Sequence, residues 1–301
     1  MSAAENQTLT VPAPAKLNLF LHITGRRADG YHELETLFQF LDFADEVHLC
    51  LRNDGVIERG RVLANVPEHQ DLSIRAAVLL QRHLGTPLGA RIDILKRLPL
   101  GGGLGGGSSD AASTLLGLNS LWQGGLGLGP LAELGLQLGA DVPVFIHGHA
   151  ALARGVGEQL SAAEPPCPWY LVLNPREKVS TAEIFALPAL TRNSTPLKIP
   201  GFVQNVAAGF EDGAFWAQTR NDCQQVVAAR YAGIRLALDW LENQASTWPG
   251  GRLTGTGGCV FAAFADEQAA QSALAARPAG MDGFVARGLN VSPAHAGWAT
   301  G

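Results

Sequence analysis

Charge is in short supply in this chain of 301 residues. Asp, Glu, Lys and Arg together make up 16% of the sequence, and the formal net charge is −5 with a pI near 5.9. We therefore expect no broad basic surface that would attract nucleic acid or an anionic membrane. A phosphorylated ligand would have to be held locally, by backbone amides or by single cations.

Cysteine and long apolar runs are also sparse. Four cysteines lie far apart without metal-ligand spacing, which predicts reduced, mostly buried thiols in a cytoplasmic protein. The opening segment MSAAENQTLT lacks the basic and apolar stretches of a secretory signal. No run approaches the roughly 20 apolar residues of a membrane span. We expect a soluble protein, with 47% hydrophobic residues available for substantial cores.

The length favours two packed domains, and the local patterns predict a mixed α+β fold. Strand patterns occur at residues 17–23 and 91–95, and helix patterns at 72–84 and 131–138, with Gly139 as a C-cap. Three prolines follow residue 158 and indicate a connector before a second α+β unit. The predicted domains are residues 10–158 and 159–301.

The most informative segment is PLGGGLGGGSSD, from Pro99 to Asp110. Its glycines accept positive φ and let backbone N–H groups approach a ligand closely. A helix that begins at Ser108 and Ser109 would add free N–H groups and a partial positive charge. Strand, glycine turn, serine cap and helix together predict a phosphate cradle.

Two other interpretations of these glycines are a flexible linker and a Rossmann turn. The apolar strand and helix on either side argue against a linker, and no clear βαβ series follows. A Walker A loop is excluded because Gly-Lys-Ser/Thr does not occur. Asp110 would repel phosphate unless it points away or faces a metal ion.

Lysine occurs only four times, and Lys16 lies in the apolar segment PAKLNL. It is either a solvated residue at the end of a strand or a compact positive charge beside a transferred phosphoryl group. Asn18 projects from the same face of the predicted strand. A site there would contain both a cation and an amide.

Asp141 follows a predicted helix end in LGADVPVF, where Pro143 disfavours helical geometry at Val142. Its carboxylate either caps the next turn or accepts a proton from a substrate hydroxyl. The sequence does not show whether it meets Lys16.

Two further segments leave their roles open. His147 and His149 lie in a predicted strand and favour solvent-facing or hydrogen-bonded side chains over a metal pair. The segment LTGTGGCVFA, residues 253–262, is either a tight β-turn or a second backbone approach to ligand.

Taken together, these segments resemble the GHMP kinase superfamily over nearly the whole chain. The motifs are PAKLNL, ADGYHEL, LPLGGGLGGGSSDAA, GADVPVF, LTGTGGCVFA and GLNVSP. The glycine turn alone indicates the superfamily. PAKLNL with ADGYHEL and GADVPVF is typical of the branch that acts on a cytidyl diphosphate ester of methylerythritol.

The resemblance implies a ribosomal-S5-like ATP-binding domain followed by a ferredoxin-like substrate domain. It implies transfer of the ATP γ-phosphoryl group to the 2-hydroxyl of the methylerythritol moiety, in non-mevalonate isoprenoid biosynthesis. ATP is the expected co-substrate, and Mg²⁺ is expected because the charge of ATP needs neutralising. The expected state is a monomer or weak homodimer that binds no nucleic acid or membrane.

The same resemblance implies roles for individual residues. Asp141 matches a catalytic base, and Lys16 matches its partner. The expected cytidyl-substrate residues are Asn18, Tyr31, His32 and Phe185, with Phe185 stacking on cytosine opposite Tyr31. The expected ATP-binding residues are Lys96, Pro99, Leu100, Gly101, Gly102, Gly103, Leu104, Gly105, Gly106, Gly107, Ser108 and Ser109. The metal ligands are unassigned.

Asp71 departs from the family pattern, in which asparagine is more usual before a leucine, so a contact of this position with adenine is left open. Other hypotheses keep the same scaffold: a homoserine or mevalonate kinase, an ATP-dependent decarboxylase, or an inactive nucleotide-binding module. The first two kinases would lack the DGYHEL and KLNL combination. The presence of both Lys16 and Asp141 argues against the inactive module.

Overall fold

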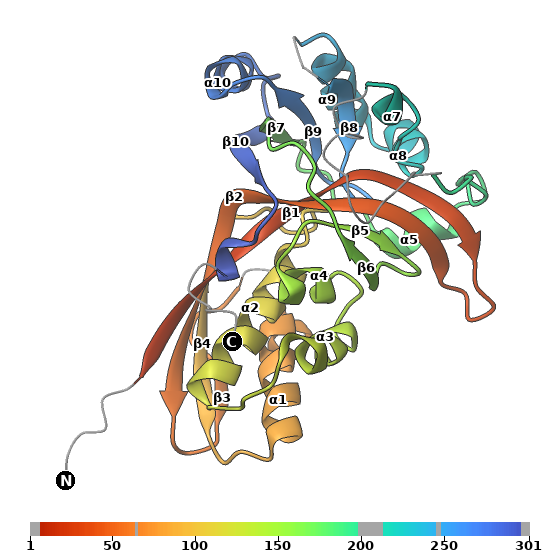
Figure 1. Cartoon of the computed structure of the whole chain (residues 1–301). Helices are drawn as coiled ribbons and strands as arrows, with labels where there is room; N and C mark the ends of the chain where they lie inside the picture. Colours follow the sequence, from red (N-terminus) through yellow and green to blue (C-terminus); the bar gives the residue numbers. More distant parts are fainter. Residues whose placement is uncertain (1–6, 64–65, 198–212, 245–247, 296–301) are drawn as a thin grey trace.

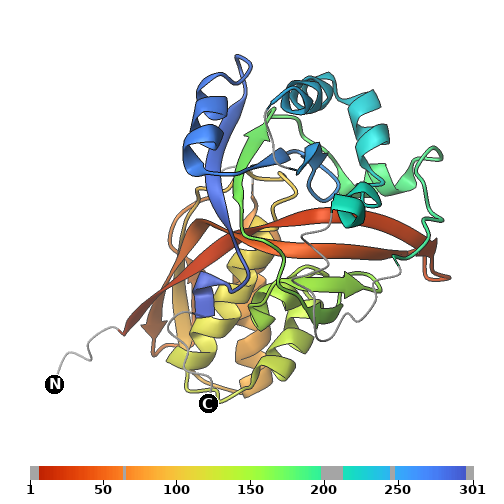
Figure 2. The same cartoon turned by 45° about the horizontal axis from the view of Figure 1, so that its top comes forward.

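The computed structural model describes residues 7–63, 66–197, 213–244 and 248–295. Figure 1 shows a long, curved strand pair that crosses the molecule, with one group of helices on one side and the C-terminal elements on the other. The same arrangement is seen after rotation in Figure 2. The fold is the mixed α+β architecture that the sequence predicts.

The first half builds one sheet and its helical cover. Its elements are β1 (Thr8–Arg26), β2 (His32–Arg52), β3 (Ile57–Arg59), η1 (Glu68–Gln70), α1 (Leu72–Leu84), β4 (Gly89–Leu95), α2 (Gly106–Leu121), α3 (Leu128–Leu136), α4 (Val142–His147), β5 (Ala151–Arg154) and β6 (Gln159–Ala162). β2 pairs with β1, β4 and β5, all antiparallel, whereas β3 joins β4 in parallel. Helices α1 and α2 pack on this sheet around a continuous apolar core.

The second half contributes another antiparallel sheet with helices packed against it. Its elements are β7 (Trp169–Asn174), α5 (Thr181–Ala186), α7 (Gly213–Ala217), α8 (Gln224–Arg230), α9 (Ala232–Glu242), β8 (Trp248–Leu253), β9 (Val260–Phe264), α10 (Glu267–Ala275), β10 (Asp282–Leu289) and η2 (Pro293–His295). α9 buries Ile234, Ala237, Leu238 and Leu241. This spacing places all four on one helical face, towards a second core.

The two sheets are continuous. The end of β10 pairs with β2 at Gly288 and Leu289, so the strand order is β3-β4-β2-β10-β7-β9-β8. The middle of β1 is covered on both faces, so residues 17–23 are buried without a break, including the polar side chains of Asn18 and His22. β6 pairs with β5 across the predicted boundary at residue 158, so the exact boundary stays a prediction.

The predicted helix at 72–84 has the expected bounds, because the Asp71 carboxylate accepts the Ser73 N–H at its start and Gly85 adopts φ 61° at its end. Asp71 also pairs with Arg59. The other predicted helix was shifted: α3 runs from Leu128 to Leu136, and its C-cap is Gln137 rather than Gly139.

Two further local predictions were wrong. Helix α2 begins at Gly106, with Gly105 as N-cap at φ 72° and no side-chain cap, so Ser108 and Ser109 lie inside its first turns. His147 is the last residue of the helix α4 rather than part of a strand, and His149 forms only an isolated antiparallel bridge with Val291. Pro143 lies in the first turn of α4, where its missing N–H costs no hydrogen bond, so it starts a helix as well as ending the preceding segment.

All four cysteines are free, and Cys223 and Cys259 are fully buried. In the part of the chain that the structure describes, every helix is too short or too polar for a transmembrane segment.

Candidate active site

A cleft of about 400 Å³ opens between the glycine turn, strands β1 and β2, and the turn before β9. Most of the predicted site residues line this cleft. They are Lys16, Asn18, Lys96, Pro99, Leu100, Gly101, Gly102, Gly103, Leu104, Gly105, Gly106, Gly107, Ser108, Asp141 and Phe185. Ser109, Tyr31 and His32 are not part of its lining. Ser109 is completely buried, and its N–H donates a hydrogen bond to the Gly105 carbonyl.

Lys16 and Asp141 meet in the cleft. Their side chains form an ion pair with Nζ 3.2 Å from Oδ2. Lys16 is almost fully buried, whereas the Asp141 side chain keeps 35% exposure. Asp141 is the N-cap residue of α4 but makes no side-chain cap hydrogen bond. The carboxylate therefore faces the cleft instead of serving as a helix cap.

Lys16, on β1, also contacts the glycine turn. Its ammonium donates to Asn18 Oδ1 at 2.5 Å and to the Gly103 carbonyl at 3.2 Å, and it lies 5.2 Å from the Phe38 ring centroid. Lys16 and Asn18 share one face of β1, as the two-residue period predicts. A buried ammonium needs such partners, and here they fix its position beside Asp141.

Thr36 and Thr254 complete this network, and sequence reasoning did not single them out. Asn18 Nδ2 donates to Thr36 Oγ1 at 2.9 Å, which fixes the orientation of the amide with its oxygen towards Lys16. The Asn18 N–H donates to Thr254 Oγ1, which in turn donates to the Gly103 carbonyl. The alternating pattern of β2 places Thr36 on an inward face, but no local signal places Thr254 here.

Parts of the glycine turn have no room for a side chain. Gly101, Gly103 and Gly105 have φ between 70° and 74°. A Cβ on Gly103 would lie 2.3 Å from the Thr254 carbonyl oxygen, and one on Gly105 would lie 2.8 Å from the Phe145 ring. Glycine is required at both positions by backbone conformation and by close packing.

The segment 253–262 is both a turn and a close backbone approach. It links β8 to β9, and the Cys259 N–H donates to the Gly102 carbonyl at 3.0 Å. Gly255 and Thr256 line the cleft. The two glycine-containing turns thus brace one another, and the second one forms part of the cleft wall.

Lys96 reaches the cleft from the end of β4 as the cation of a buried cluster. Its ammonium contacts Asp45 and lies 2.7 Å from Asp110 Oδ2. Burial raises the pKa of Asp110 to about 7, against the opposing effect of Lys96. Asp110 thus points at Lys96 rather than at the cleft. Burial alone would lower the pKa of Lys96, but Asp110 and Asp45 raise it, so the lysine stays charged.

The stacking of Phe185 on cytosine opposite Tyr31 stays a prediction, and the structure shows how the rings of the protein lie. Phe185 on α5 lines the cleft, but the ring that stacks on it is His32, with centroids 4.8 Å apart. Tyr31 is 65% exposed. Arg192 links His32 to α5: it donates to His32 Nε2 at 3.1 Å and to the Phe185 carbonyl at 2.8 Å. Burial and the nearby Arg192 lower the pKa of His32, which favours a neutral ring.

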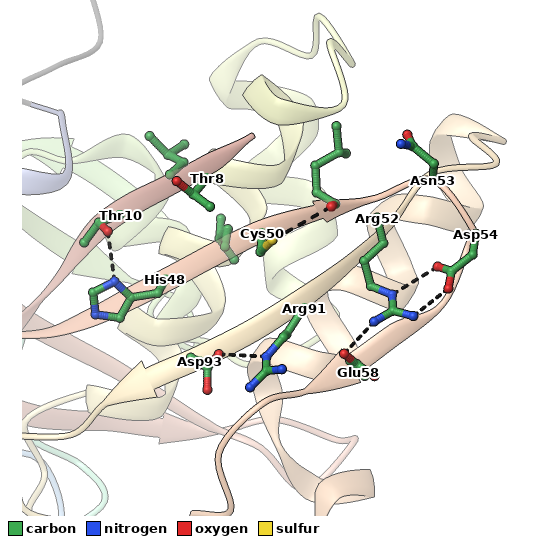
Figure 3. Close-up of a pocket in the computed structure, with 13 residues that line it drawn as sticks. Thr8, Thr10, His48, Cys50, Arg52, Asn53, Asp54, Glu58, Arg91 and Asp93 are labelled. Carbon is green, nitrogen blue, oxygen red and sulfur yellow. Dashed lines mark hydrogen bonds and ion pairs between the residues drawn. The ribbon is translucent and has the colours of Figure 1, made fainter. Parts of the chain in front are cut away.

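A larger hollow of about 910 Å³ lies on the outer face of the first sheet, and Figure 3 shows its lining. Its charged side chains pair with one another: Arg52 binds Asp54 and Glu58, and Arg91 binds Asp93. It contains none of the predicted site residues. The chemistry that the sequence predicts is therefore concentrated in the smaller cleft.

Comparison with known proteins agrees with this geometry. Residues 71–149 match the model of the GHMP kinases N terminal domain, and residues 199–282 match that of the GHMP kinases C terminal. A 4-diphosphocytidyl-2-C-methyl-D-erythritol kinase of Pseudomonas putida is 54% identical, over 96% of both chains. The protein of the same name from Nitrosospira multiformis is 51% identical, over 95% of this chain and 93% of its own.

A solved structure of the same kind supports the assignment. A crystal structure of a 4-(cytidine 5'-diphospho)-2C-methyl-D-erythritol kinase superimposes with a TM-score of 0.77 at 30% identity, covering 93% of this chain and 99% of its own. This chain belongs to the GHMP kinases, in the family of the 4-diphosphocytidyl-2-C-methyl-D-erythritol kinases.

Proposed function

We propose that this protein phosphorylates the 2-hydroxyl of 4-diphosphocytidyl-2-C-methyl-D-erythritol with ATP, giving the 2-phosphate and ADP, in non-mevalonate isoprenoid precursor biosynthesis. The observation that carries the proposal is the ion pair of Lys16 and Asp141, with Nζ and Oδ2 3.2 Å apart in the cleft that the glycine turn lines. The relatives named for this activity cover nearly the full chain.

In this proposal Asp141 is the general base. Its partly exposed carboxylate can accept the proton of the 2-hydroxyl, while the hydroxyl oxygen forms a bond to the γ-phosphorus. The bond between that phosphorus and the bridging oxygen of ADP breaks. Lys16, held by Asn18 and Gly103, supplies a fixed positive charge for the transferring group.

The glycine turn is the proposed phosphate site. Side chains are absent from six of its seven positions, Gly101 to Gly107, and the helix that follows starts at Gly106 with unpaired N–H groups in its first turn. Lys96 adds one cation at this end. The Ser109 side chain is completely buried and does not line the cleft, so its part in ATP binding stays a prediction.

Mg²⁺ would supply charge neutralisation on the phosphates. Among the described residues, no three His, Cys, Asp or Glu side chains form a metal cluster. This agrees with an ion that takes most of its ligands from phosphate oxygens and water. The Ser108 hydroxyl, in the cleft wall, is the side chain that would hold it.

We propose that the cytidyl end of the substrate lies at the β1–β2 end of the cleft, near Asn18 and Phe185. The Phe185 ring offers an apolar face on which a base can stack. His32 is the first residue of β2 and Tyr31 directly precedes it, and the His32 ring stacks on one face of Phe185. We also propose a cytoplasmic protein, monomeric or weakly dimeric, with domains at 10–158 and 159–301.

A coupled assay that measures ADP release tests the proposal. We expect turnover with 4-diphosphocytidyl-2-C-methyl-D-erythritol and none above background with homoserine or mevalonate. Mass analysis should find a product heavier by one phosphoryl group. Released carbon dioxide would indicate a decarboxylase instead, and ATP binding without any turnover would indicate an inactive module.

A further inference from the structure

Asp45, at the β2 end of the cluster around Lys96, belongs to no motif that the sequence analysis singled out. It is completely buried, so its carboxylate needs hydrogen-bond partners on both oxygens. Oδ1 accepts the N–H groups of Arg97 at 2.5 Å and Leu98 at 2.8 Å. Oδ2 accepts the Lys96 ammonium. One side chain thus holds both Lys96 and the chain that leads into the glycine turn.

The contacts of Asp45 place the Lys96 ammonium beside the start of α2. Nζ lies 3.4 Å from the point that a Cβ on Gly106 would occupy, at the first residue of α2. Lys96 lines the cleft and is 18% exposed, whereas its two carboxylate partners are 0% and 5% exposed. The cation is therefore held from behind and presented at the end of the helix where anions bind.

The number of N–H donors on an ammonium group also supports a role for Lys96 in binding a ligand. A lysine has three N–H donors, and two of those of Lys96 point at Asp45 and Asp110. The third can donate to a ligand oxygen in the cleft. A lysine side chain held in this way has already lost its rotamer freedom, so ligand binding does not have to supply that entropy cost.

We propose that Asp45 is a positioning residue for the nucleotide: together with Asp110 it holds the Lys96 ammonium where the polyphosphate of ATP binds. The inference rests on the proposed function, because it needs ATP phosphates at the glycine turn. Asp45 does not touch the nucleotide itself and acts through Lys96.

The test is a double-mutant cycle read by nucleotide binding. Asp45→Asn keeps the size of the side chain and an oxygen for the two N–H groups, but removes the charge that holds Lys96. The affinity for a non-hydrolysable ATP analogue should fall about tenfold, the size of one charge-assisted hydrogen bond. The KM for the cytidyl substrate and kcat should stay within about twofold, a split that a general folding defect would not produce.

Lys96→Met decides whether Asp45 acts through the lysine. In the Lys96→Met background, Asp45→Asn should cost less than a further twofold in analogue affinity. The control is Glu46→Gln, since Glu46 is the adjacent carboxylate and pairs with Arg97 on the surface. It should leave the affinity unchanged. An equal loss from Asp45→Asn in both backgrounds, or no loss in the wild-type background, overturns the inference.

Two further outcomes are informative. If Asp45→Asn does not fold, Asp110→Asn is the alternative. It keeps the Asp45 bonds to the backbone and removes only the second carboxylate that contacts Lys96. It should weaken analogue binding about threefold in the wild-type background and not in Lys96→Met, and equal effects in both backgrounds overturn the inference. If the wild-type protein binds no ATP analogue, the proposed function fails first.

Discussion

At the scale of single residues, the cleft depends on one exposed carboxylate beside one buried cation. Asp141→Asn should leave ATP binding largely intact, because Asp141 is not part of the glycine turn and asparagine has the same size. Turnover should fall at least about 10²-fold, as for other general bases. Binding of an ATP analogue and kcat, measured on the same preparation, check this. Near-normal kcat would remove Asp141 from the mechanism.

Besides its ion pair with Asp141, Lys16 donates hydrogen bonds that stabilise the fold around the cleft. Lys16→Ala should lower kcat, because no positive charge would remain at this position in the cleft. It should also lower stability, since Asn18 Oδ1 and the Gly103 carbonyl would lose a donor. Steady-state kinetics and thermal unfolding separate the two effects. A change in KM for the cytidyl substrate alone would contradict the charge-stabilising role.

His22 gives stability a pH dependence away from the cleft. It is 1% exposed, and burial lowers its pKa from 6.5, against the opposing effect of Asp222. Because the folded state holds this proton less well than the unfolded state, the stability is fully present above pH 6.5 and is lost as the pH falls below it. His22→Gln keeps an acceptor for the Arg220 N–H and should flatten this part of the curve. Urea unfolding between pH 7.5 and 5 measures it, and curves of equal slope would refute the assignment.

At the scale of elements, the junction of the glycine turn and α2 tolerates no side chain at Gly105. Gly105→Ala would force an L side chain into φ 72° and against Phe145 and the Lys16 stem. We expect a loss of about 1–3 kcal/mol in unfolding free energy and weaker ATP binding. Gly127→Ala is a matched control, because a Cβ there meets nothing within 4 Å and its φ is −73°. Equal stability of the two variants would contradict the argument.

The sequence predicted this element in outline and misplaced its start. Glycines and serines in a row suggested a serine cap, but whether a serine caps a helix depends on which residue leaves helical geometry first. Here Gly105 does so at φ 72°, and Phe145, from a distant part of the chain, leaves no room for a side chain at this position. By contrast, Asp71 and Gly85 terminate α1 through local hydrogen bonds and conformation, so residues 72–84 could be predicted from the sequence alone.

The distinction between local signals and contacts of distant residues also explains which parts of the site could be predicted from the sequence. The common face of Lys16 and Asn18 follows from the two-residue period of a strand, which is local. The contact between Thr254 and Gly103 joins residues 151 positions apart, and no local pattern contains it. The family resemblance brought Asp141 and Lys16 together, whereas the stacking of His32 on Phe185 depends on how Arg192 connects β2 to the end of α5.

At the scale of the whole molecule, buried Arg252 ties the second sheet to the long strand β1. It donates to the Leu19 carbonyl at 2.6 Å, and to Thr219 Oγ1 and the Thr219 carbonyl at 2.8 and 3.0 Å. Burial lowers its pKa to about 10, so it stays charged at neutral pH. Since the glycine turn is braced by residues that follow β8, this link also holds the two walls of the cleft together.

Arg252→Met should therefore weaken the whole structure and the cleft at once. Removing the guanidinium leaves the carbonyls of Leu19 and Thr219 buried without a donor, at a cost of about 3–5 kcal/mol. For a chain of this length, that corresponds to a fall in Tm of roughly 5–15 °C. Arg176→Met is the matched control, because Arg176 forms an exposed ion pair with Asp282, and such pairs contribute about 0–1 kcal/mol. Thermal unfolding of both variants measures the contribution of Arg252 to stability. If Arg252→Met melts within about 2 °C of Arg176→Met, the two halves of the molecule are held together by their apolar cores and not by this arginine.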